Sequence, residues 1–556
     1  MMDTQMENTL LEVEGLRIEA TSQTDVKTVL VDDVSFTLKR GEVLGLIGES
    51  GAGKSTIGLS SMHYTRTGCE ITGGRIIFNG RDIRAISKAE ERSLRGVKIA
   101  YIAQSAAASF NPALTIGRQV CEVVIRHRLM SKGAAKTRAI DLFRSLDLPD
   151  PERFGKRYPH QVSGGQLQRA MAAMAMIAEP DLLVFDEPTT ALDVTTQVEV
   201  LAAFRALVRE RNTAALYITH DLAVVAQIAD RIMVLRHGKM VETGTAEAIL
   251  HDPQQDYTKR LVAERNAATT ERFVQASHSD EAAVLRMDKI VASYSGLPRV
   301  IDNVGMELRR GDTLAVVGES GSGKSTLARV IVGLLPRESG ELFFQGQELS
   351  AALAQRSRDE LRRIQMIYQI PDIALNPKQT LLEIIGRPIE FYLGKSKKDV
   401  RERVLELLRQ IELPESFITR RPPELSGGQK QRVCIARALA AQPDVIICDE
   451  VTSALDPLVA EEILNLLRRL QEKFGLAYLF ITHDLGTVRR IANKVAIMRK
   501  GQVVAYGGTA EVFSPPYHPY TELLLSSVPE MRSKWLDEVL AKRKVQTGPA
   551  SGLEAS

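Results

Sequence analysis

A nine-residue run that occurs twice constrains the fold of this chain more than any other feature. GESGAGKST spans residues 48–56 and GESGSGKST spans residues 318–326, so both satisfy the pattern G-x-x-x-x-G-K-[ST]. Each run follows a short apolar segment, Val43–Ile47 or Thr313–Val317, of the kind that forms a buried parallel strand. A strand, a glycine-rich turn and a helix N-terminus together present backbone N–H groups to phosphate. The sequence therefore predicts two phosphate-binding turns.

The residues of the two turns have predicted roles in holding a nucleotide triphosphate. Lys54 and Lys324 would reach the β- and γ-phosphates, and the hydroxyls of Ser55 and Ser325 would bind Mg²⁺. The alternative is a glycine-rich strand-to-helix turn without a ligand. The recurrence of the nine-residue run after an apolar segment in both halves argues against that alternative. The predicted nucleotide-binding residues are Gly48, Glu49, Ser50, Gly51, Ala52, Gly53, Lys54, Ser55 and Thr56, with Gly318, Glu319, Ser320, Gly321, Ser322, Gly323, Lys324, Ser325 and Thr326.

The second half of the chain repeats the first. Lys54 and Lys324 are 270 positions apart, and Asp186 and Asp449 are 263 positions apart. So long a period excludes a solenoid and predicts two whole domains. The polar stretch between them lacks apolar periodicity, which is typical of a linker. We expect a first domain at 1–266, a linker at 267–283, a second domain at 284–546 and a disordered tail at 547–556.

Composition limits the classes of site that this chain can carry. The net charge of +3 over 556 residues gives no indication of a nucleic-acid partner. The four cysteines form no C-x-x-C pair, which argues against a zinc site, an iron–sulfur site or a disulfide framework. No uninterrupted apolar run reaches the length of a membrane span. If the protein works at a membrane, other chains are expected to span it.

Two acidic pairs follow buried strands at corresponding places. Asp186 and Glu187 form the first pair, and Asp449 and Glu450 form the second. Ligands of an open parallel sheet bind beyond the carboxyl ends of its strands. We expect Asp186 and Asp449 to hold Mg²⁺, and Glu187 and Glu450 to orient or deprotonate an attacking water. A pair of surface charges is the alternative, and the phosphate-binding turn that precedes each pair weakens it.

In each half the turn is followed by a lone glutamine, a Ser-Gly-Gly-Gln run that opens a helix, the acidic pair and a strand that ends in histidine. This order of motifs resembles that of the ATP-binding cassette (ABC) ATPases. An ordinary serine cap is the alternative for the Ser-Gly-Gly-Gln run. The resemblance implies an α/β fold class: two tandem P-loop NTPase domains, each a mixed, mainly parallel sheet core with a helical insertion subdomain. The Ser-Gly-Gly-Gln residues are Ser163, Gly164, Gly165 and Gln166, and Ser426, Gly427, Gly428 and Gln429.

The resemblance also implies residue roles with ATP and Mg²⁺ as cofactors. Two such cassettes close head to tail, so the P-loop of one half and the Ser-Gly-Gly-Gln run of the other would clamp one ATP. Tyr294 is placed to stack on adenine, whereas the first half has Ile18-Glu19-Ala20 in that region. The remaining implied roles are metal or lytic-water contact for Gln104 and Gln369, γ-phosphate contact for the catalytic His220 and His483, and coupling of the two sites for Asp193 and Asp456.

The carboxyl-terminal run 515–524 resembles the tail of oligopeptide and dipeptide importer cassettes. The chain is thus similar to the fused ATPase component of such importers, a translocase-class ATPase. The resemblance implies two integral-membrane permease subunits and an extracytoplasmic solute-binding protein as partners, and a peripheral place on the cytoplasmic face of the bacterial inner membrane. Because no cysteine follows Cys448, we predict no iron–sulfur centre.

The transported solute is left open among peptides, opines, glutathione and related molecules, with peptides favoured by the tail. The alternative function is a soluble tandem-cassette ATPase that acts on ribosomes or nucleic acid. A short, mixed linker and the absence of paired cysteines both weigh against that alternative.

Overall fold

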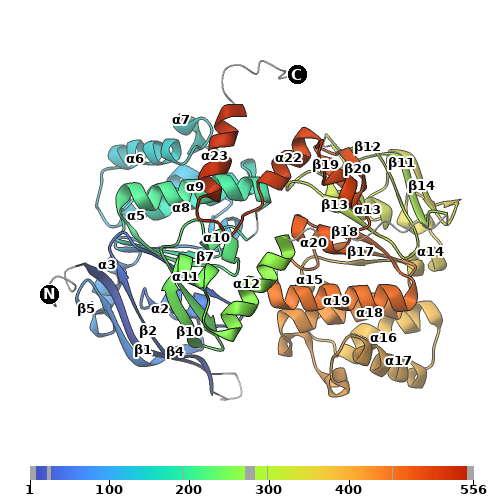
Figure 1. Ribbon diagram of the computed structural model, residues 1–556, viewed down its shortest axis with the longest axis horizontal. Helices are drawn as coiled ribbons and strands as arrows, with labels where there is room; N and C mark the ends of the chain where they lie inside the picture. Colours follow the sequence, from blue (N-terminus) through green and yellow to red (C-terminus); the bar gives the residue numbers. More distant parts are fainter. Residues whose placement is uncertain are drawn as a thin grey trace. The chain divides into compact units, whose positions relative to one another are not determined.

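The computed structural model describes residues 8–21, 27–190, 192–269, 282–296, 298–453 and 455–546, and these form two compact units. One unit consists of residues 1–265 and 529–556, and the other of residues 266–528. Figure 1 shows sheets and helices in each unit. The predicted tail at 547–556 and most of the predicted linker lie outside the described residues.

The first unit contains a six-stranded sheet and a four-stranded sheet. All neighbours in the six-stranded sheet are parallel except β9 and β10. In sheet order, the six strands are β10 (Lys239–Thr245), β9 (Arg231–Arg236), β3 (Val43–Gly48), β8 (Ala214–Ile218), β7 (Leu182–Asp186) and β6 (Ile99–Ile102). The antiparallel sheet has the order β2 (Lys27–Lys39), β1 (Thr9–Thr21), β4 (Cys69–Phe78) and β5 (Arg81–Asp82).

The second unit repeats this plan. Its mixed sheet again places the strand that feeds the P-loop between parallel neighbours. The six strands are β16 (Ile364–Ile367), β17 (Val445–Asp449), β18 (Ala477–Ile481), β13 (Thr313–Val317), β19 (Lys494–Arg499) and β20 (Gln502–Gly508). The antiparallel sheet contains β12 (Arg299–Leu308), β11 (Leu285–Ser293), β14 (Ser339–Phe344) and β15 (Gln347–Glu348).

Helices complete each unit. Those of the first are α2 (Lys54–Ser60), α3 (Lys88–Leu94), α4 (Ala106–Ser109), α5 (Ile116–Arg126), α6 (Lys132–Ser145), α7 (Pro151–Phe154), α8 (Gly164–Met176), α9 (Val194–Arg211), α10 (Leu222–Val225), α11 (Ala246–His251), α12 (Asp256–Thr269) and α23 (Trp535–Gln546). Those of the second are α13 (Lys324–Ile331), α14 (Arg358–Arg363), α15 (Pro371–Ala374), α16 (Leu381–Leu393), α17 (Lys397–Gln410), α18 (Gly427–Ala440), α19 (Pro457–Phe474), α20 (Leu485–Ile491), α21 (Thr509–Val512) and α22 (Pro519–Ser526).

The predicted fold class is confirmed by these sheets and helices. β3 and β13 lead directly into the two P-loops, and β7 and β17 end at the two acidic pairs. Each of these four strands is buried along its whole length, as the continuous apolar runs require. The functional motifs of each unit therefore meet at the carboxyl edge of one sheet.

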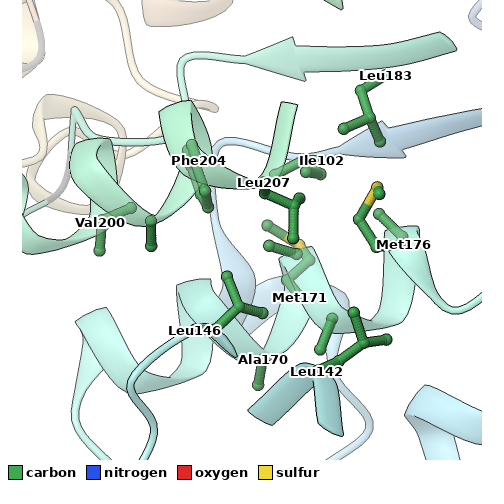
Figure 2. Close-up of a cluster of buried hydrophobic side chains, with 14 of the residues drawn as sticks. Ile102, Leu142, Leu146, Ala170, Met171, Met176, Leu183, Val200, Phe204 and Leu207 are labelled. Carbon is green, nitrogen blue, oxygen red and sulfur yellow. The ribbon is translucent and has the colours of Figure 1, made fainter. Parts of the chain in front are cut away.

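A continuous apolar core fixes the insertion helices of the first unit to its sheet. Figure 2 shows Leu142 of α6 and Met171 of α8 on one side of this core, with Leu207 of α9 and Leu183 of β7 on the other. All four side chains are buried. α8, which begins at the Ser-Gly-Gly-Gln run, is therefore held by packing along most of its length.

The last described helix, α23, is part of the first unit. Trp535, Leu536 and Val539 are 2%, 0% and 6% exposed and join the apolar core that also contains α8 and α9. Figure 1 shows α23 beside these two helices. We expected residues 284–546 to form one domain, whereas the structure groups the segment from Pro529 onward with residues 1–265. The apolar side chains of α23 are buried in the core of the first unit.

Candidate functional site

Glycine is required where the P-loops approach the neighbouring strand and loop. A Cβ at Gly48 would lie 2.1 Å from the carbonyl oxygen of Leu235, and one at Gly318 would lie 2.1 Å from that of Met498. Gly53 and Gly323 have φ of 92° and 105°, which residues other than glycine rarely adopt. Both P-loops thus have a tight backbone path that only this glycine pattern permits.

The P-loop lysines are buried and turn back over their own loops. Lys54 Nζ donates to the carbonyl oxygens of Gly48 and Glu49 at 2.6 and 2.8 Å. Lys324 Nζ makes the same two contacts with Gly318 and Glu319, both at 2.8 Å. In both units the ammonium group is therefore held above the loop whose N–H groups would cradle phosphate.

A tyrosine from outside each P-loop forms a hydrogen bond with the backbone of that loop. The hydroxyl of Tyr257 accepts a hydrogen bond from the N–H of Glu49 at 3.2 Å, and that of Tyr520 accepts one from Glu319, also at 3.2 Å. Sequence reasoning assigned no role to these residues. The repeat could have indicated them, because the two tyrosines are 263 positions apart, the same separation as the acidic pairs.

Each P-loop serine contacts the first carboxylate of its acidic pair. Ser55 Oγ donates to Asp186 Oδ1 at 2.6 Å, and Ser325 Oγ donates to Asp449 Oδ1 at 3.1 Å. Burial raises the pKa of Asp449, against the hydrogen bond from Ser325. In the first unit the Tyr101 hydroxyl also donates to Asp186 Oδ2 at 2.6 Å, and burial followed by this contact raises the pKa of Tyr101. The second unit has Met366 at that place, 265 positions later.

These contacts fit a Mg²⁺ ion held together with phosphate. A hydroxyl and a carboxylate oxygen lie side by side in each unit, and oxygen ligands of this kind suit a hard cation. Among the described residues there is no cluster of three or more His, Cys, Asp or Glu side chains that could bind a metal. The remaining ligands would be phosphate oxygens, water and, as the resemblance implies, Gln104 or Gln369.

The second carboxylate of each pair lies at the centre of a small polar group. Glu187 Oε1 is 3.3 Å from His220 Nδ1, and its Oε2 accepts a hydrogen bond from Gln104 Nε2 at 3.2 Å. In the other unit Glu450 Oε1 is 3.5 Å from His483 Nδ1, and Gln369 Nε2 donates to Glu450 Oε2 at 2.6 Å. The predicted Gln, Glu and His residues are thus brought together twice, within hydrogen-bonding reach or just beyond it.

Backbone strain marks the same glutamates. Glu187 and Glu450 have φ of 49° and 50°, in the left-handed region that non-glycine residues seldom occupy. Their N–H groups donate to the carbonyl oxygens of Ile218 and Ile481, each at 2.9 Å. Such conformations persist where the surroundings impose them, and they concentrate at functional sites.

Charge pairing sets the protonation state of the Glu–His pairs. Burial disfavours the charged carboxylate of Glu187, but the hydrogen bond and charge of His220 outweigh it and lower its pKa. Burial likewise disfavours the imidazolium of His220, and Glu187 overcomes this effect and raises the pKa of His220. The same opposed shifts occur in Glu450 and His483. Each glutamate is therefore kept ionised by its histidine.

The Ser-Gly-Gly-Gln runs form the N-termini of α8 and α18. Ser163 Oγ accepts from the Gln166 N–H at 3.3 Å while Gln166 Oε1 accepts from the Ser163 N–H at 3.2 Å. Ser426 and Gln429 form the same reciprocal pair. The alternative of a serine cap is thus correct as local structure. It leaves the first glycine of each run, Gly164 or Gly427, exposed at a helix N-terminus.

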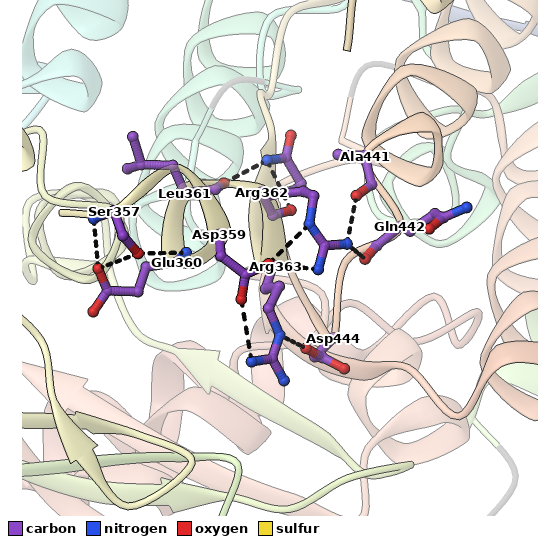
Figure 3. Close-up of polar contacts among 10 residues, drawn as sticks. Ser357, Asp359, Glu360, Leu361, Arg362, Arg363, Ala441, Gln442 and Asp444 are labelled. Atoms are coloured by element: carbon purple, nitrogen blue, oxygen red, sulfur yellow. Dashed lines mark hydrogen bonds and ion pairs between the residues drawn. The ribbon is translucent and has the colours of Figure 1, made fainter. Parts of the chain in front are cut away.

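The strand that leads to Gln369 is anchored by the helix before it. Figure 3 shows Arg362 and Arg363 at the end of α14 reaching the segment before β17. Arg362 Nη1 donates to the carbonyl oxygens of Ala441 and Gln442 at 3.2 and 2.9 Å, and Arg363 pairs with Asp444. These contacts fix the start of β16, so Gln369 extends from a held strand.

The other predicted residues have defined places. Asp193 and Asp456 cap α9 and α19 by accepting from Thr196 N at 2.9 Å and Val459 N at 3.1 Å. The Tyr294 hydroxyl accepts from Arg329 Nη1 at 2.9 Å and lies 3.5 Å from Thr326 Oγ1. It is therefore near the second P-loop. In the first unit Ile18 is buried in the core.

Comparison with protein-family models gives two matches. The ABC transporter model matches residues 31–190 and 301–453. The chain belongs to this family. A second model, the oligopeptide/dipeptide transporter C-terminal region, matches residues 504–551 of this ABC transporter ATPase. The predicted family and the oligopeptide/dipeptide transporter type of its tail are both confirmed.

Relatives of this ABC transporter ATPase match over most of its length. It is 39% identical over 558 residues to the glutathione import ATP-binding protein GsiA of Shigella sonnei and to that of Escherichia coli strain K12, covering 94% of this chain and 89% of each relative. Among solved structures, cbiO1 of Clostridium perfringens is 29% identical, with a TM-score of 0.39, and covers 42% of this chain and 92% of its own. Among the described residues, no helix combines the length and apolar character needed to cross a membrane.

Proposed function

We propose that this ABC ATPase drives a bacterial importer of peptide-like solutes, coupling ATP binding and hydrolysis to uptake through membrane permease subunits supplied by other chains. The importer-type carboxyl-terminal region at residues 504–551 supports this task. Relatives named for glutathione import support it further and add glutathione to the candidate solutes. The alternative of a factor acting on ribosomes or nucleic acid is not favoured by these comparisons.

The observation that carries the catalytic part of the proposal is the doubled group of Glu, His and Gln beside a P-loop. Glu187 and Glu450 would each orient the water that attacks the γ-phosphate. Because their pKa values are lowered, these carboxylates are weak bases, so their main task would be to align the water rather than to take its proton early. His220 and His483, held beside them, would face the γ-phosphate.

Mg²⁺ would bind between each P-loop serine and its aspartate. The ion would supply positive charge to the β- and γ-phosphates when bound. The neighbouring hydroxyl and carboxylate oxygens in both units support this assignment. The exposed glycines at the N-termini of α8 and α18 are suited to phosphate contact, and their pairing with the P-loop of the other cassette stays a prediction.

A permease contact is supported by apolar side chains beside Gln369. Tyr368, Ile370 and Ile373 are 42%, 46% and 81% exposed, although large apolar residues are usually covered. Phe391 on α16 of the same insertion is also exposed. A permease segment that covered these side chains would couple changes at Gln369 and Glu450 during ATP binding and hydrolysis to movement of the permease. This would place the chain on the cytoplasmic face of the membrane, with an extracytoplasmic solute-binding protein as the further partner.

Replacing both glutamates tests the catalytic part. The double variant Glu187→Gln and Glu450→Gln is expected to bind ATP with Mg²⁺ and lose steady-state turnover by roughly 100-fold or more. Filter retention of labelled ATP and phosphate release measure the two properties. Glu210→Gln with Glu472→Gln makes the same chemical change at exposed helix positions and should leave turnover intact. Undiminished turnover in the first variant would overturn the proposed site.

Uptake measurements test the transport part. Cells that express the chain with its neighbouring permease and binding-protein genes should accumulate labelled glutathione or a labelled dipeptide, and the double glutamate variant should abolish this. Comparing the two solutes decides between them. Copurification with ribosomal RNA and normal uptake in the variant would instead favour the alternative function.

A further inference from the structure

Residues 529–546 pack against two segments that flank the proposed catalytic group of the first unit. One is α10, which follows His220, and the other is α9, which begins directly after Asp193. Arg205 of α9 pairs with Asp537 of α23, with its Nη1 3.4 Å from Oδ2, and Arg543 Nη1 donates to the carbonyl oxygen of Thr195 at 3.4 Å. α23 therefore contacts α9 at two levels.

Gln227, just beyond α10, makes three hydrogen bonds to this segment. It is 2% exposed. Its Nε2 donates to the carbonyl oxygens of Glu530 and Arg532 at 2.7 and 3.0 Å, and its Oε1 accepts from the Leu536 N–H at 3.1 Å. Both ends of one amide are thus used to join α10 to the first turn of α23 and the residues before it. Nε2 also lies 3.2 Å from the carbonyl oxygen of Ala223 in α10. Because the other three partners of this buried amide lie in one segment, its hydrogen bonding is sensitive to displacement of that segment.

A second connection reaches the residue beside His220. Asp221 forms an ion pair with Arg265, whose Nε lies 3.2 Å from Asp221 Oδ1. Arg265 Nη2 also donates to the carbonyl oxygen of Pro529 at 3.2 Å. The loop that carries His220 is therefore linked through Arg265 to the beginning of the carboxyl-terminal segment.

The second unit holds the equivalent loop with contacts from its own neighbourhood. By the offset of 263, Arg490 stands at the place of Gln227 and Asp484 at the place of Asp221. Arg490 pairs with Glu461 of α19, and Asp484 accepts from the hydroxyl of Thr487. The repeat thus preserves the aspartate after the histidine and changes what holds it.

We propose that residues 529–546 are a positioning element for His220, so that the end of the chain sets the turnover of the first ATP site. Gln227 and Arg265 are its positioning residues, and they act on His220 through α10 and Asp221. The inference rests on the role given to His220 and Glu187 in the proposed function. Displacing the segment would free the loop while leaving the loop of the second unit in place.

The experiment uses the full chain with Leu536→Asp, which puts a charge into the core position of α23, and Leu536→Met as the conservative control. Trp535 is the only tryptophan in the chain, so its fluorescence reports the docking of α23 directly. In Leu536→Asp its emission should move to longer wavelength. Amide exchange should accelerate in the peptide covering 219–227 and stay unchanged in that covering 482–490. Leu536→Met should resemble the wild type in all three.

ATP turnover supplies the second readout. Leu536→Asp should lower kcat by up to about twofold, the share of one of two sites, with a smaller change in KM. Gln227→Glu, which removes the Nε2 donations to Glu530 and Arg532 without a large change in volume, should act in the same direction and provides a check in case the first variant misfolds. Arg490→Ala is the matched change in the second unit and should leave exchange at 219–227 unaltered.

Unchanged exchange at 219–227 in both Leu536→Asp and Gln227→Glu overturns the inference, as does equal acceleration in both cassettes. Undiminished turnover in the double glutamate variant overturns the proposed function instead, because the exchange and fluorescence results would still stand by themselves.

Discussion

The two glycines of the first Ser-Gly-Gly-Gln run should respond in opposite ways to alanine. A Cβ at Gly165 would lie 2.1 Å from Thr196 Cγ2 of α9, whereas one at Gly164 would have its nearest neighbour, Leu192 Cδ2, at 3.9 Å. The second distance is ordinary van der Waals contact. Gly165→Ala is therefore expected to force α8 and α9 apart, while Gly164→Ala leaves the packing unchanged.

The size of the effect follows from two opposing contributions. Overpacking of this severity costs about 3 kcal/mol, and alanine in place of a helical glycine returns about 1 kcal/mol. Gly165→Ala should thus lose about 2 kcal/mol, which corresponds to roughly 4–8 °C in the unfolding temperature of a unit this large. Gly164→Ala should keep or slightly raise the unfolding temperature.

Differential scanning calorimetry of the full chain measures this loss, and a second substitution checks its cause. Thr196→Ser removes the methyl group that Gly165→Ala would strike. The double variant should recover most of the lost stability. Gly164→Ala should fold normally and still lower ATP turnover if that exposed glycine contacts phosphate.

An unfolding temperature of Gly165→Ala equal to that of the wild type would refute the packing argument. So would a double variant that is no more stable than Gly165→Ala, because the strain would then come from some other atom. The second unit provides a repeat of the test, since a Cβ at Gly428 would lie 2.5 Å from Val459 Cγ1.

Two further predictions concern electrostatics. Tyr101→Phe removes the hydroxyl that donates to Asp186, so the Mg²⁺ concentration for half-maximal ATP turnover should rise about tenfold for the first site. Met366→Leu in the second unit is the control and should have no effect. An unchanged Mg²⁺ titration for Tyr101→Phe would contradict this prediction. The hydrogen bond from Lys494 lowers the pKa of Glu307, so the contribution of this carboxylate to stability is present above its ordinary pKa of 4.5 and is lost as the pH falls through the lowered value. Thermal unfolding should therefore show Glu307→Gln less stable than the wild type at pH 7 and no different at strongly acidic pH, and a difference that persists there would rule out this ion pair as the cause.

The catalytic edge of each unit could be predicted from local sequence. Continuous apolar runs predict the strands before Lys54 and Asp186, and the carboxyl ends of parallel strands meet at one edge whatever the rest of the chain does. The apolar stripe from Val400 to Ile411 likewise predicts α17, which spans Lys397–Gln410 and is followed directly by Ile411. In each case the signal lies within a few residues of the structure that it predicts.

Other features depend on residues far apart in the chain. Nothing near Trp535 indicates that it packs with α8 and α9, because its partners lie more than 300 positions earlier. The Tyr101 contact with Asp186 could not be predicted either, because the two residues are far apart in the sequence. The repeat does not indicate it, because Met366 replaces the tyrosine in the second half. The sequence repeat indicates what the two halves share and not what distinguishes them.

The position of α23 has a consequence for synthesis of the protein. Residues 1–265 are synthesised long before Trp535, Leu536 and Val539, so part of the hydrophobic core of the first cassette stays uncovered until those three residues have been translated. A gene split between the cassettes would leave that half without its final helix. The fused reading frame therefore does more than supply two ATPases in equal number: a segment encoded after the second unit completes the core of the first.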